Sequence, residues 1–373
     1  MKALRIAIIG RGLIGSAAAK YLALAGRDVM LIGPDEPSDK RLHDGVFASH
    51  YDEGRITRKL DADPFWSKVS GASIARYRDI EAASGVPFFT ESGAMMAGPA
   101  SGDLMRGVAE VRRAAGIEAE RLTGATLASR FPFFSFDDDV LAFYEQRGAG
   151  HLSPRNLVRA QSQLAERAGA CLIRVVASAI SVGKGSVAIQ TDNGLVHADR
   201  VLIAAGGFSN ALMKDALPLK IYARTVAFFE IDATEAGRLR TMPSLVYQAA
   251  DGRDPYLLPP IRYPHGKTYV KLGGDPQDVT LDDPQAIKDW FRTGGSAKVG
   301  ALLEQQILSR MPGLRFKAMH TEACVTTFTE ADRPDIRHLD DCVAVAVAGC
   351  GRGAKCSDEL GRMAAGLYSA GKF

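Results

Sequence analysis

The chain has 373 residues, of which 46% are hydrophobic and 24% are charged. These proportions are typical of a globular protein that buries a sizeable core in one or two interleaved domains. The 46 basic and 43 acidic residues leave a net charge of +3, and this near balance argues against nucleic acid as the main partner. No apolar run of about 18 residues lacks an explanation within a fold, so we expect no membrane span.

The ends and the cysteines give two further expectations. The N-terminus enters an apolar run within its first residues, which leaves no room for a signal peptide, so we expect a cytoplasmic protein. The five cysteines are an odd number and include no CxxC pair. We therefore expect neither a disulfide framework nor a zinc site.

Residues 5–33 predict the strand, glycine turn, helix and strand that hold the pyrophosphate of a dinucleotide. Gly10 permits the turn, Gly12 lets the backbone approach the phosphates, and Gly15 lets the helix lie close to the sheet. The N-terminus of the helix then favours the anion. The residues of this turn that we expect at the cofactor are Gly10, Arg11, Gly12, Leu13, Ile14 and Gly15.

One position departs from the dinucleotide-binding pattern. The end of the second strand normally has Asp or Glu for the ribose, whereas this chain has Gly33, followed by Asp35 and Glu36. Either carboxylate could substitute, or backbone and water could hold the ribose. No arginine directly follows the strand, which disfavours NADP.

The next segment, residues 34–63, is too long for a plain connection, and loops of this length are usually functional. It contains SHYDEGRITR, in which Arg55 and Arg58 would lie on the same side of a helical turn. The spacing allows a solvated basic face, or a clamp in which guanidinium groups bind a carboxylate. Spacing alone leaves both interpretations open.

The rest of the chain alternates between short strands and amphipathic helices. A further buried strand runs into glycines at 200–207. Another apolar run, at 342–348, leads into GRGAK and a helix. A sheet that begins at the N-terminus and is completed near the C-terminus implies an inserted middle. We expect helices at 65–84, 104–115, 122–131, 154–169, 287–311 and 357–370, strands at 88–98 (two), 140–147, 171–176, 179–182, 187–191, 194–198, 222–232, 244–248 and 255–271 (two), and a loop at 148–154.

Six separated motifs occur in order along the chain. They are GRGLIG, SHYDEGRITR, RVLIAAGGFSN, YVKLG, EACVTTFT and GRGAK. In sequence and order they resemble motifs of the flavin amine oxidases of the monomeric sarcosine oxidase group, within the glycine/D-amino-acid oxidase superfamily. The resemblance covers nearly the whole chain.

The resemblance implies an α/β fold, in which a Rossmann-like FAD-binding domain is interleaved with an α+β substrate domain on a mixed or antiparallel sheet. The FAD-binding domain would comprise residues 1–85, 149–218 and 320–373, and the substrate domain residues 86–148 and 219–319. Beyond the glycine turn, the implied FAD contacts are Ser49, His50, Arg55, Val176, Ala205, Gly206, Cys324, Gly349, Gly351, Arg352, Gly353 and Lys355.

Family roles correspond to individual residues of this chain. Arg55 resembles the arginine beside the isoalloxazine ring, and Lys271 resembles the lysine that, through a water, helps reduced flavin react with O2. Arg58 and Lys355 resemble the pair that binds the substrate carboxylate. Tyr256 resembles an active-site tyrosine. Arg58 and Lys355 could also be surface cations, whereas an unpaired lysine in the apolar strand around Lys271 would be costly.

Three positions qualify this correspondence. Cys324 falls on the cysteine that forms the 8α thioether with FAD, but Thr326 replaces the family's aromatic residue, and the cysteine could be a small buried hydrophobe. Asp275 and Arg352 replace two family histidines. Arg352, together with Arg58, Lys355 and Arg262, would suit a substrate with a second carboxylate, such as iminodiacetate.

The function implied is that of an FAD-dependent oxidase of a secondary amino acid or N-substituted glycine. Its carboxylate would be clamped, a hydride equivalent would pass to flavin N5, water would hydrolyse the imine, and O2 would be reduced to H2O2. The alternatives are a D-amino-acid oxidase, a dehydrogenase that passes electrons to a partner, a tRNA-modifying flavoprotein, and a flavin-binding subunit without catalysis. The expected partners are a small anionic amine and O2, with no nucleic acid or membrane, and the protein would be a monomer or a homodimer.

Overall fold

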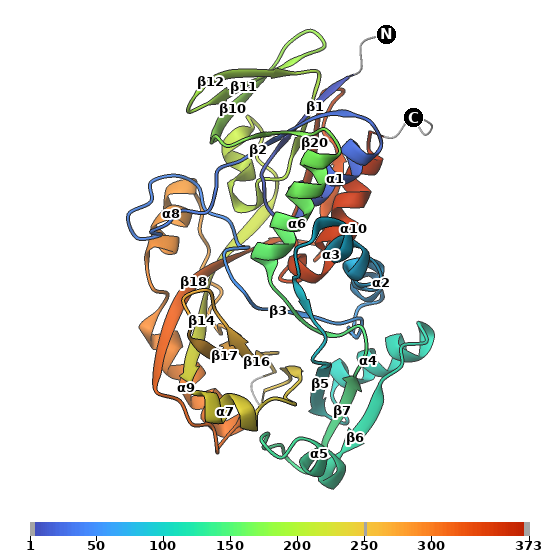
Figure 1. Ribbon diagram of the computed structural model, residues 1–373, viewed down its shortest axis with the longest axis vertical. Helices are drawn as coiled ribbons and strands as arrows, with labels where there is room; N and C mark the ends of the chain where they lie inside the picture. Colours follow the sequence, from blue (N-terminus) through green and yellow to red (C-terminus); the bar gives the residue numbers. More distant parts are fainter. Residues whose placement is uncertain (1–3, 250–251, 369–373) are drawn as a thin grey trace.

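The computed structural model describes residues 4–249 and 252–368. Its upper part in Figure 1 contains a six-stranded sheet in the order β19-β20-β13-β1-β2-β9. Five of these strands are parallel, and β19 is antiparallel to β20. The strands are β1 (Arg5–Ile9), β2 (Asp28–Ile32), β9 (Cys171–Ile173), β13 (Arg200–Ile203), β19 (Asp335–His338) and β20 (Val343–Val347).

Both faces of this sheet are covered, which explains why its strands are near-continuous apolar runs. Three helices pack on one face, and α1 lies between the other two (Figure 1). Gly361 allows the closest approach of α10 to α1, because a Cβ there would collide with Ala17. The helices are α1 (Leu13–Leu24), α6 (Pro154–Arg167) and α10 (Gly353–Gly366).

The other face of the six-stranded sheet packs against a small antiparallel sheet and a 3-10 helix, η1 (Gly206–Leu212). The Asp192-Asn193-Gly194 hairpin expected from the sequence joins the last two strands of this sheet. The strands are β10 (Ala177–Val182), β11 (Val187–Thr191) and β12 (Gly194–Ala198).

The lower part of the molecule is built on an eight-stranded sheet in the order β18-β14-β17-β16-β15-β5-β7-β6 (Figure 1). Its pairs are antiparallel except β15 with β5, so the sheet is mixed, as expected. The strands are β5 (Ala94–Pro99), β6 (Glu120–Thr123), β7 (Val140–Glu145), β14 (Leu219–Ile231), β15 (Ser244–Tyr247), β16 (Tyr256–Arg262), β17 (Thr268–Gly273) and β18 (Ala318–Thr329).

A fourth sheet, of three short strands in the order β3-β8-β4, includes the segment that begins at Arg55. The remaining elements complete the two parts. They are β3 (Arg55–Thr57), β4 (Phe89–Thr90), β8 (Gly150–Leu152), α2 (Pro64–Ile74), α3 (Tyr77–Ser84), α4 (Asp103–Ala114), α5 (Gly124–Arg130), α7 (Ala233–Arg238), α8 (Pro284–Arg292) and α9 (Ala297–Arg310).

Most expected elements are present with small shifts of their ends. The helix expected over 65–84 is the pair α2 and α3, and the helix expected over 287–311 is the pair α8 and α9. The final helix begins at Gly353 rather than at residue 357. Residues 369–370 of its expected range lie outside the described part of the chain.

Strand pairing explains one shifted helix start and one expectation that is wrong. In the range 122–131 the helix begins only at Gly124, because the residues up to Thr123 form β6 and pair with β7. Thr123 and Thr126 then form a capping box. The loop expected over 148–154 contains β8, which pairs with both β3 and β4.

The domain boundary expected at residue 320 falls inside β18. This strand pairs with β14 from Ala318 to Thr329, so it belongs to the eight-stranded sheet along its whole length. The division into two domains otherwise stays a prediction. Among the described residues, no helix has the length and apolar character to cross a membrane, and no three His, Cys, Asp or Glu side chains are grouped to hold a metal ion.

Candidate active site

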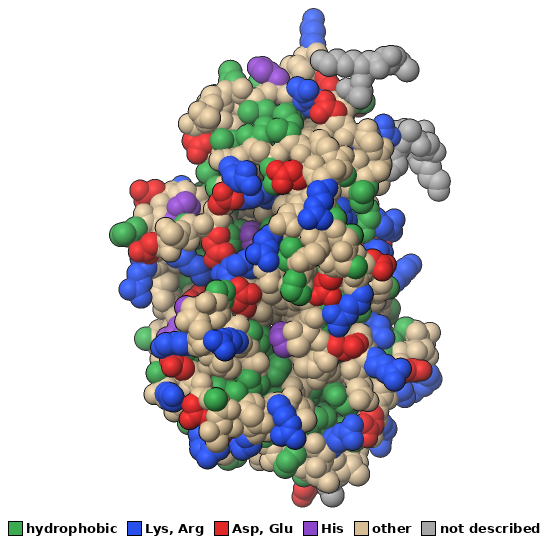
Figure 2. Space-filling view, in the orientation of Figure 1, with side chains coloured by type: hydrophobic (Ala, Val, Ile, Leu, Met, Phe, Trp, Pro, Cys, Tyr) green, Lys and Arg blue, Asp and Glu red, His purple; other side chains and the backbone are tan. Residues whose placement is uncertain are grey.

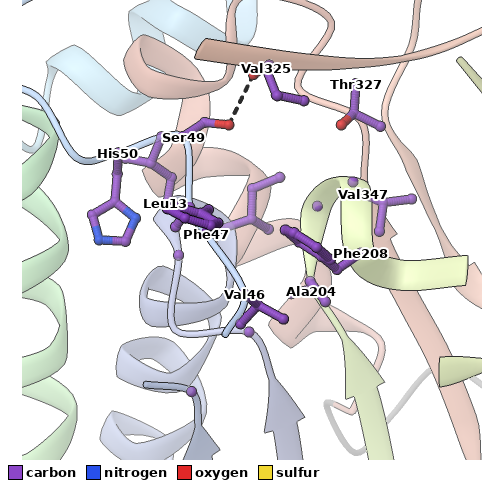
Figure 3. Close-up of a pocket in the computed structure, with 18 of the residues that line it drawn as sticks. Leu13, Val46, Phe47, Ser49, His50, Ala204, Phe208, Val325, Thr327 and Val347 are labelled. Atoms are coloured by element: carbon purple, nitrogen blue, oxygen red, sulfur yellow. Dashed lines mark hydrogen bonds between the residues drawn. The ribbon is translucent and has the colours of Figure 1, made fainter. Parts of the chain in front are cut away.

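A cavity of about 420 Å³ lies at the carboxyl ends of the parallel strands and extends to β18. Open α/β sheets bind their ligands at this edge, and the volume is within the range of small-molecule and cofactor sites. Figure 3 shows side chains of Leu13, Phe47, Phe208 and Val347 around one common space. Ser49 closes one side by donating a hydrogen bond to the carbonyl oxygen of Val325 in β18, at 2.9 Å.

The glycine turn has the geometry that the motif predicts. Gly10 has a φ of +116°, and a Cβ there would collide with the carbonyl group of Ala204. A Cβ on Gly15 would collide with the carbonyl oxygen of Gly10, so this glycine allows close packing of helix and strand. A Cβ on Gly12 would meet no atom within 4 Å. Gly12 therefore leaves open space beside the start of α1.

Two helices begin at the cavity wall, α1 at Leu13 and α10 at Gly353. Neither has a side-chain cap or an acidic residue in its first turn. Their first N–H groups and dipoles are consequently available to a bound anionic group.

Two buried polar atoms in the cavity wall, His50 Nδ1 and Thr326 Oγ1, have no hydrogen-bond partner. Burial, together with Arg11 and Arg155, lowers the pKa of His50 to about 3, so the ring is neutral. Buried polar groups are rarely left unpaired in native proteins. With the two helix N-termini and the open space at Gly12, they fit a cofactor such as FAD, which has a pyrophosphate and polar ring edges.

Most residues expected to contact FAD line this cavity. Gly15, Arg352 and Lys355 are the exceptions: Gly15 lies beneath the turn, and the two cations lie in a neighbouring cluster. The expected residues in the cavity wall are Gly10, Arg11, Gly12, Leu13, Ile14, Ser49, His50, Arg55, Val176, Ala205, Gly206, Cys324, Gly349, Gly351 and Gly353.

The end of β2 explains the missing acidic residue. A Cβ at Gly33 would lie 2.7 Å from the backbone nitrogen of Arg11, so no side chain fits there. The Arg11 guanidinium donates to the Pro34 carbonyl at 2.9 Å and pairs with Asp35. Arg155 donates two hydrogen bonds to the Glu36 carboxylate, at 2.6 and 2.7 Å. Both carboxylates considered for the ribose are therefore already paired.

Arg55 and Lys271 meet at a buried carboxylate, Asp52, which the sequence analysis did not select. The Lys271 ammonium group is fully buried and contacts Asp52 and the carbonyl oxygen of Gly54, the latter at 2.9 Å. Arg55 also pairs with Asp52, and Tyr263 donates its hydroxyl proton to the same carboxylate at 2.7 Å. We call these four side chains, Asp52, Arg55, Tyr263 and Lys271, the Asp52 cluster.

Cys324 and Tyr256 lie beside the Asp52 cluster. Cys324 lines the cavity, and its sulfur lies 3.5 Å from Nη2 of Arg55. The ring of Tyr256 has its centroid 5.8 Å from Nζ of Lys271. Burial raises the pKa of Tyr256 to about 12, although Arg55 opposes this shift. Tyr256 therefore keeps its hydroxyl proton at neutral pH.

Arg58, Lys355 and Arg352 converge on a second buried carboxylate, Asp61. Its Oδ2 atom is 2.8 Å from Nζ of Lys355, 3.7 Å from Arg58 and 3.8 Å from Arg352. Burial alone would raise the pKa of Asp61, but Lys355 and Arg58 hold it well below its usual range. We call Asp61 and these three cations the Asp61 cluster.

The cations of the Asp61 cluster differ in how far they are already paired. Arg352 donates to Asp332 at 3.0 Å and lies over the ring of Trp66. Arg58 makes no hydrogen bond with the described residues, and its buried Nε has no partner. Arg262, expected to join this group, is exposed near the end of β16 and does not reach the cluster.

A buried glutamate fixes the segment that holds Arg58 and Asp61. Glu145 at the end of β7 is fully buried and accepts hydrogen bonds from the backbone N–H groups of Lys59 and Leu60, at 3.0 and 3.1 Å. Hydrogen bonds from these two successive N–H groups hold the backbone between Arg58 and Asp61 in one position. Glu145 is thus a positioning residue for this part of the site.

Sequence reasoning found the cations but missed the carboxylates between them. A signal was present, because Asp52 lies three residues before Arg55 and Asp61 three residues after Arg58. Such spacing usually indicates a surface ion pair. Only the folded chain brings Lys271 and Lys355, which are 219 and 294 residues away from their partners, to these carboxylates.

Comparison with known proteins agrees with this geometry. The family model described as FAD dependent oxidoreductase (DAO) matches residues 5–367. The chain is 26% identical to monomeric sarcosine oxidase from Bacillus sp. (strain NS-129), over 98% of this chain and 93% of that protein. It is 25% identical to N-methyl-L-tryptophan oxidase from Salmonella dublin, over 96% of this chain and 92% of that protein.

A solved structure is similar over the same extent. NikD, an unusual amino acid oxidase essential for nikkomycin biosynthesis, superposes with a TM-score of 0.77 at 18% identity, and the match covers 100% of this chain and 96% of that one. The resemblance, the fold class and the cofactor predicted from the motifs are confirmed. The chain belongs to the DAO family of FAD-dependent oxidoreductases.

Proposed function

We propose that this enzyme oxidises the CH–NH bond of a secondary amino acid, of the N-methylated or N-substituted glycine class, and passes the electrons to O2 to form H2O2. The observation that supports this most is Arg58, a largely buried guanidinium without a hydrogen-bond partner among the described residues, three residues after Arg55 of the cavity wall. Two relatives at about 25% identity bear the names of oxidases of N-methylated amino acids.

In this proposal the chain binds and orients the amine. A guanidinium presents paired donors that match a carboxylate, so Arg58 would bind the substrate carboxylate and fix the direction of the α-carbon. Lys355 and Arg352 lie beside it, paired with Asp61 and Asp332. FAD, when bound, supplies the acceptor for the two electrons and the hydride equivalent of the C–N oxidation. Water completes the hydrolysis of the imine to an aldehyde or keto acid and an amine.

The Asp52 cluster would act in the later step, in which the reduced cofactor reacts with O2. Arg55 lies in the cavity wall beside Cys324, and Asp52 pairs with both Arg55 and Lys271, so the cluster has two positive charges and one negative charge. Positive charge fixed near a site of developing negative charge stabilises it, because the dipoles need no reorganisation. We assign these two cations to stabilising the reduced cofactor and the anionic state formed with O2.

The alternative of a tRNA-modifying flavoprotein requires a continuous basic surface. On the face in Figure 2, Lys and Arg side chains are interspersed with Asp and Glu. This face therefore offers no basic stripe. A second alternative, a dehydrogenase, differs from an oxidase only in its electron acceptor, so a measurement of peroxide without an added acceptor separates the two.

The test is the oxidation of N-methyl amino acids by the holoenzyme with H2O2 as the readout. We expect Arg58→Gln to lower kcat/KM by about 100-fold, because the substrate carboxylate loses its charged donors. The matched control is Arg262→Gln, an exposed arginine on β16, which we expect to stay within about twofold of wild type. An unchanged kcat/KM in Arg58→Gln, with normal FAD content, would contradict the proposal.

A further inference from the structure

We propose that Asp61 sets the charge selectivity of the carboxylate-binding cluster and makes it prefer an amino acid with one carboxylate to one with two. The inference rests on the proposed function and narrows its substrate class. It runs against the expectation that Arg352 and Arg262 provide for a second carboxylate.

The first step is the position of Asp61. All three cations of the cluster approach the same oxygen, Oδ2, and the nearest is Lys355 Nζ at 2.8 Å. Asp61 and Lys355 are both almost fully buried. A buried lysine this close to a carboxylate is paired, because an isolated ammonium in that environment would be strongly disfavoured. The positive charge of Lys355 is therefore neutralised by Asp61 within the protein.

The second step is the pairing of Arg352. Its Nη1 atom donates to the Asp332 carboxylate at 3.0 Å and to the carbonyl oxygen of Cys350 at 3.1 Å. Its guanidinium carbon also lies over the ring of Trp66, 5.3 Å from the ring centroid. Arg352 therefore already has an acidic partner, and a ligand carboxylate would have to compete with Asp332.

The third step is the balance of charge. Arg58, Lys355 and Arg352 face Asp61 and Asp332, and Asp254 also interacts with Arg58 and Arg352. Only Arg58 lacks a hydrogen-bonded partner in the part of the chain that is described. One incoming carboxylate can pair with Arg58. A second would enter next to Asp61 or Asp332, where like charges repel.

The experiment measures binding of two small anions to the holoenzyme by titration calorimetry, acetate with one carboxylate and malonate with two. We expect wild type to bind malonate no more tightly than acetate. The variant Asp61→Asn keeps the shape of the side chain but removes its charge. We expect it to increase malonate binding relative to acetate by about tenfold, because roughly one repulsion between like charges is lost.

The matched control is Asp63→Asn, on the same segment. Asp63 caps α2 and pairs with Arg333 at 2.7 Å, and asparagine caps helices equally well. We expect this variant to keep the wild-type ratio. The FAD content of each variant shows whether it is folded.

Two results would overturn the inference. One is a wild-type enzyme that binds malonate at least about tenfold more tightly than acetate, which needs no variant to be stable. The other is an Asp61→Asn enzyme in which the ratio stays that of wild type. Neither readout requires turnover. If no secondary amino acid is oxidised, the proposed function is contradicted, and the binding ratio still decides the role of Asp61.

Discussion

Buried ion pairs determine how much positive charge each part of the site presents. In the Asp52 cluster, Arg55 and Lys271 both contact Oδ2 of Asp52. The hydroxyl of Tyr263 donates a hydrogen bond to Oδ1 of the same carboxylate. The net charge is therefore one unit positive rather than two. Because charge buried away from water interacts strongly, a change of one unit here has consequences for any redox group in the cavity.

Asp52→Asn tests this charge balance. Removal of the carboxylate raises the positive charge by one unit, which favours the reduced, more negative cofactor, so we expect the reduction potential of bound FAD to rise by about 30 mV or more. The same change leaves Lys271 and Arg55 without their counter-charge, and we expect a loss of about 3–5 kcal/mol in unfolding free energy. Potentiometric titration and urea unfolding measure the two effects.

The control for this variant is Glu53→Gln. Glu53 is the next residue, but it pairs with Arg155 and Ser153 rather than with Lys271. We expect its FAD potential to match that of wild type. A potential in Asp52→Asn that is unchanged, or lower, would contradict the role given to the carboxylate.

Cys324 carries the prediction of covalent FAD. This residue lines the cavity and its sulfur lies beside Arg55, so we expect the flavin to stay with the precipitated protein after acid denaturation. Cys324→Ser should release all of the FAD into the supernatant. The matched control is Cys350→Ser, because Cys350 also lines the cavity, and it should keep the flavin attached. Yellow colour in the wild-type supernatant rules out the linkage.

At the scale of elements, short strands position residues of the candidate site. The β3-β8-β4 sheet positions Arg55 and also buries His151 in β8, where Ser92 Oγ lies 3.4 Å from Nδ1. Burial lowers the pKa of His151 to about 4. The unfolded chain binds a proton at this histidine near pH 6.5, whereas the folded protein does not, so its stabilising effect is complete above pH 6.5 and is lost as the pH falls towards 4.

This difference predicts acid sensitivity of the small sheet. We expect His151 to account for about 2 kcal/mol of the stability lost between pH 6.5 and pH 5, and His151→Gln should lose correspondingly less. Urea unfolding of the holoenzyme at the two pH values gives the comparison. His197→Gln, at an exposed histidine on β12, is the control. An identical pH dependence in His151→Gln and wild type would show that this histidine is not the cause.

The sequence predicted an element correctly where neighbouring residues alone determine its structure. The Gly10 to Gly15 turn fits its motif because Gly10 has a positive φ and Gly15 allows close packing that any side chain would prevent. The helix expected over 122–131 is wrong at its start because strand pairing overrides helical periodicity at Thr123. Arg55, Arg58, Lys271 and Lys355 could be selected from motifs, whereas Asp52 and Asp61 could not, since their roles depend on distant partners.

At the scale of the whole molecule, the site exists only where the two large sheets meet. The glycine turn and α10 come from the part with the six-stranded sheet, and Lys271 and Cys324 come from β17 and β18 of the eight-stranded sheet (Figure 1). The segment from Asp52 to Asp61 joins them through its ion pairs with Lys271 and Lys355. Binding of the cofactor and of the amine therefore depends on the complete fold.

The most direct test of the account is anaerobic mixing of the purified holoenzyme with an N-methyl amino acid, with the visible absorbance of the flavin as the readout. We predict that the flavin is reduced by a secondary amine with one carboxylate, and that air then restores the colour with formation of H2O2. A secondary amine without a carboxylate should leave the flavin oxidised. Flavin that stays oxidised with every N-methyl amino acid, or that the amine without a carboxylate reduces equally fast, would contradict the account.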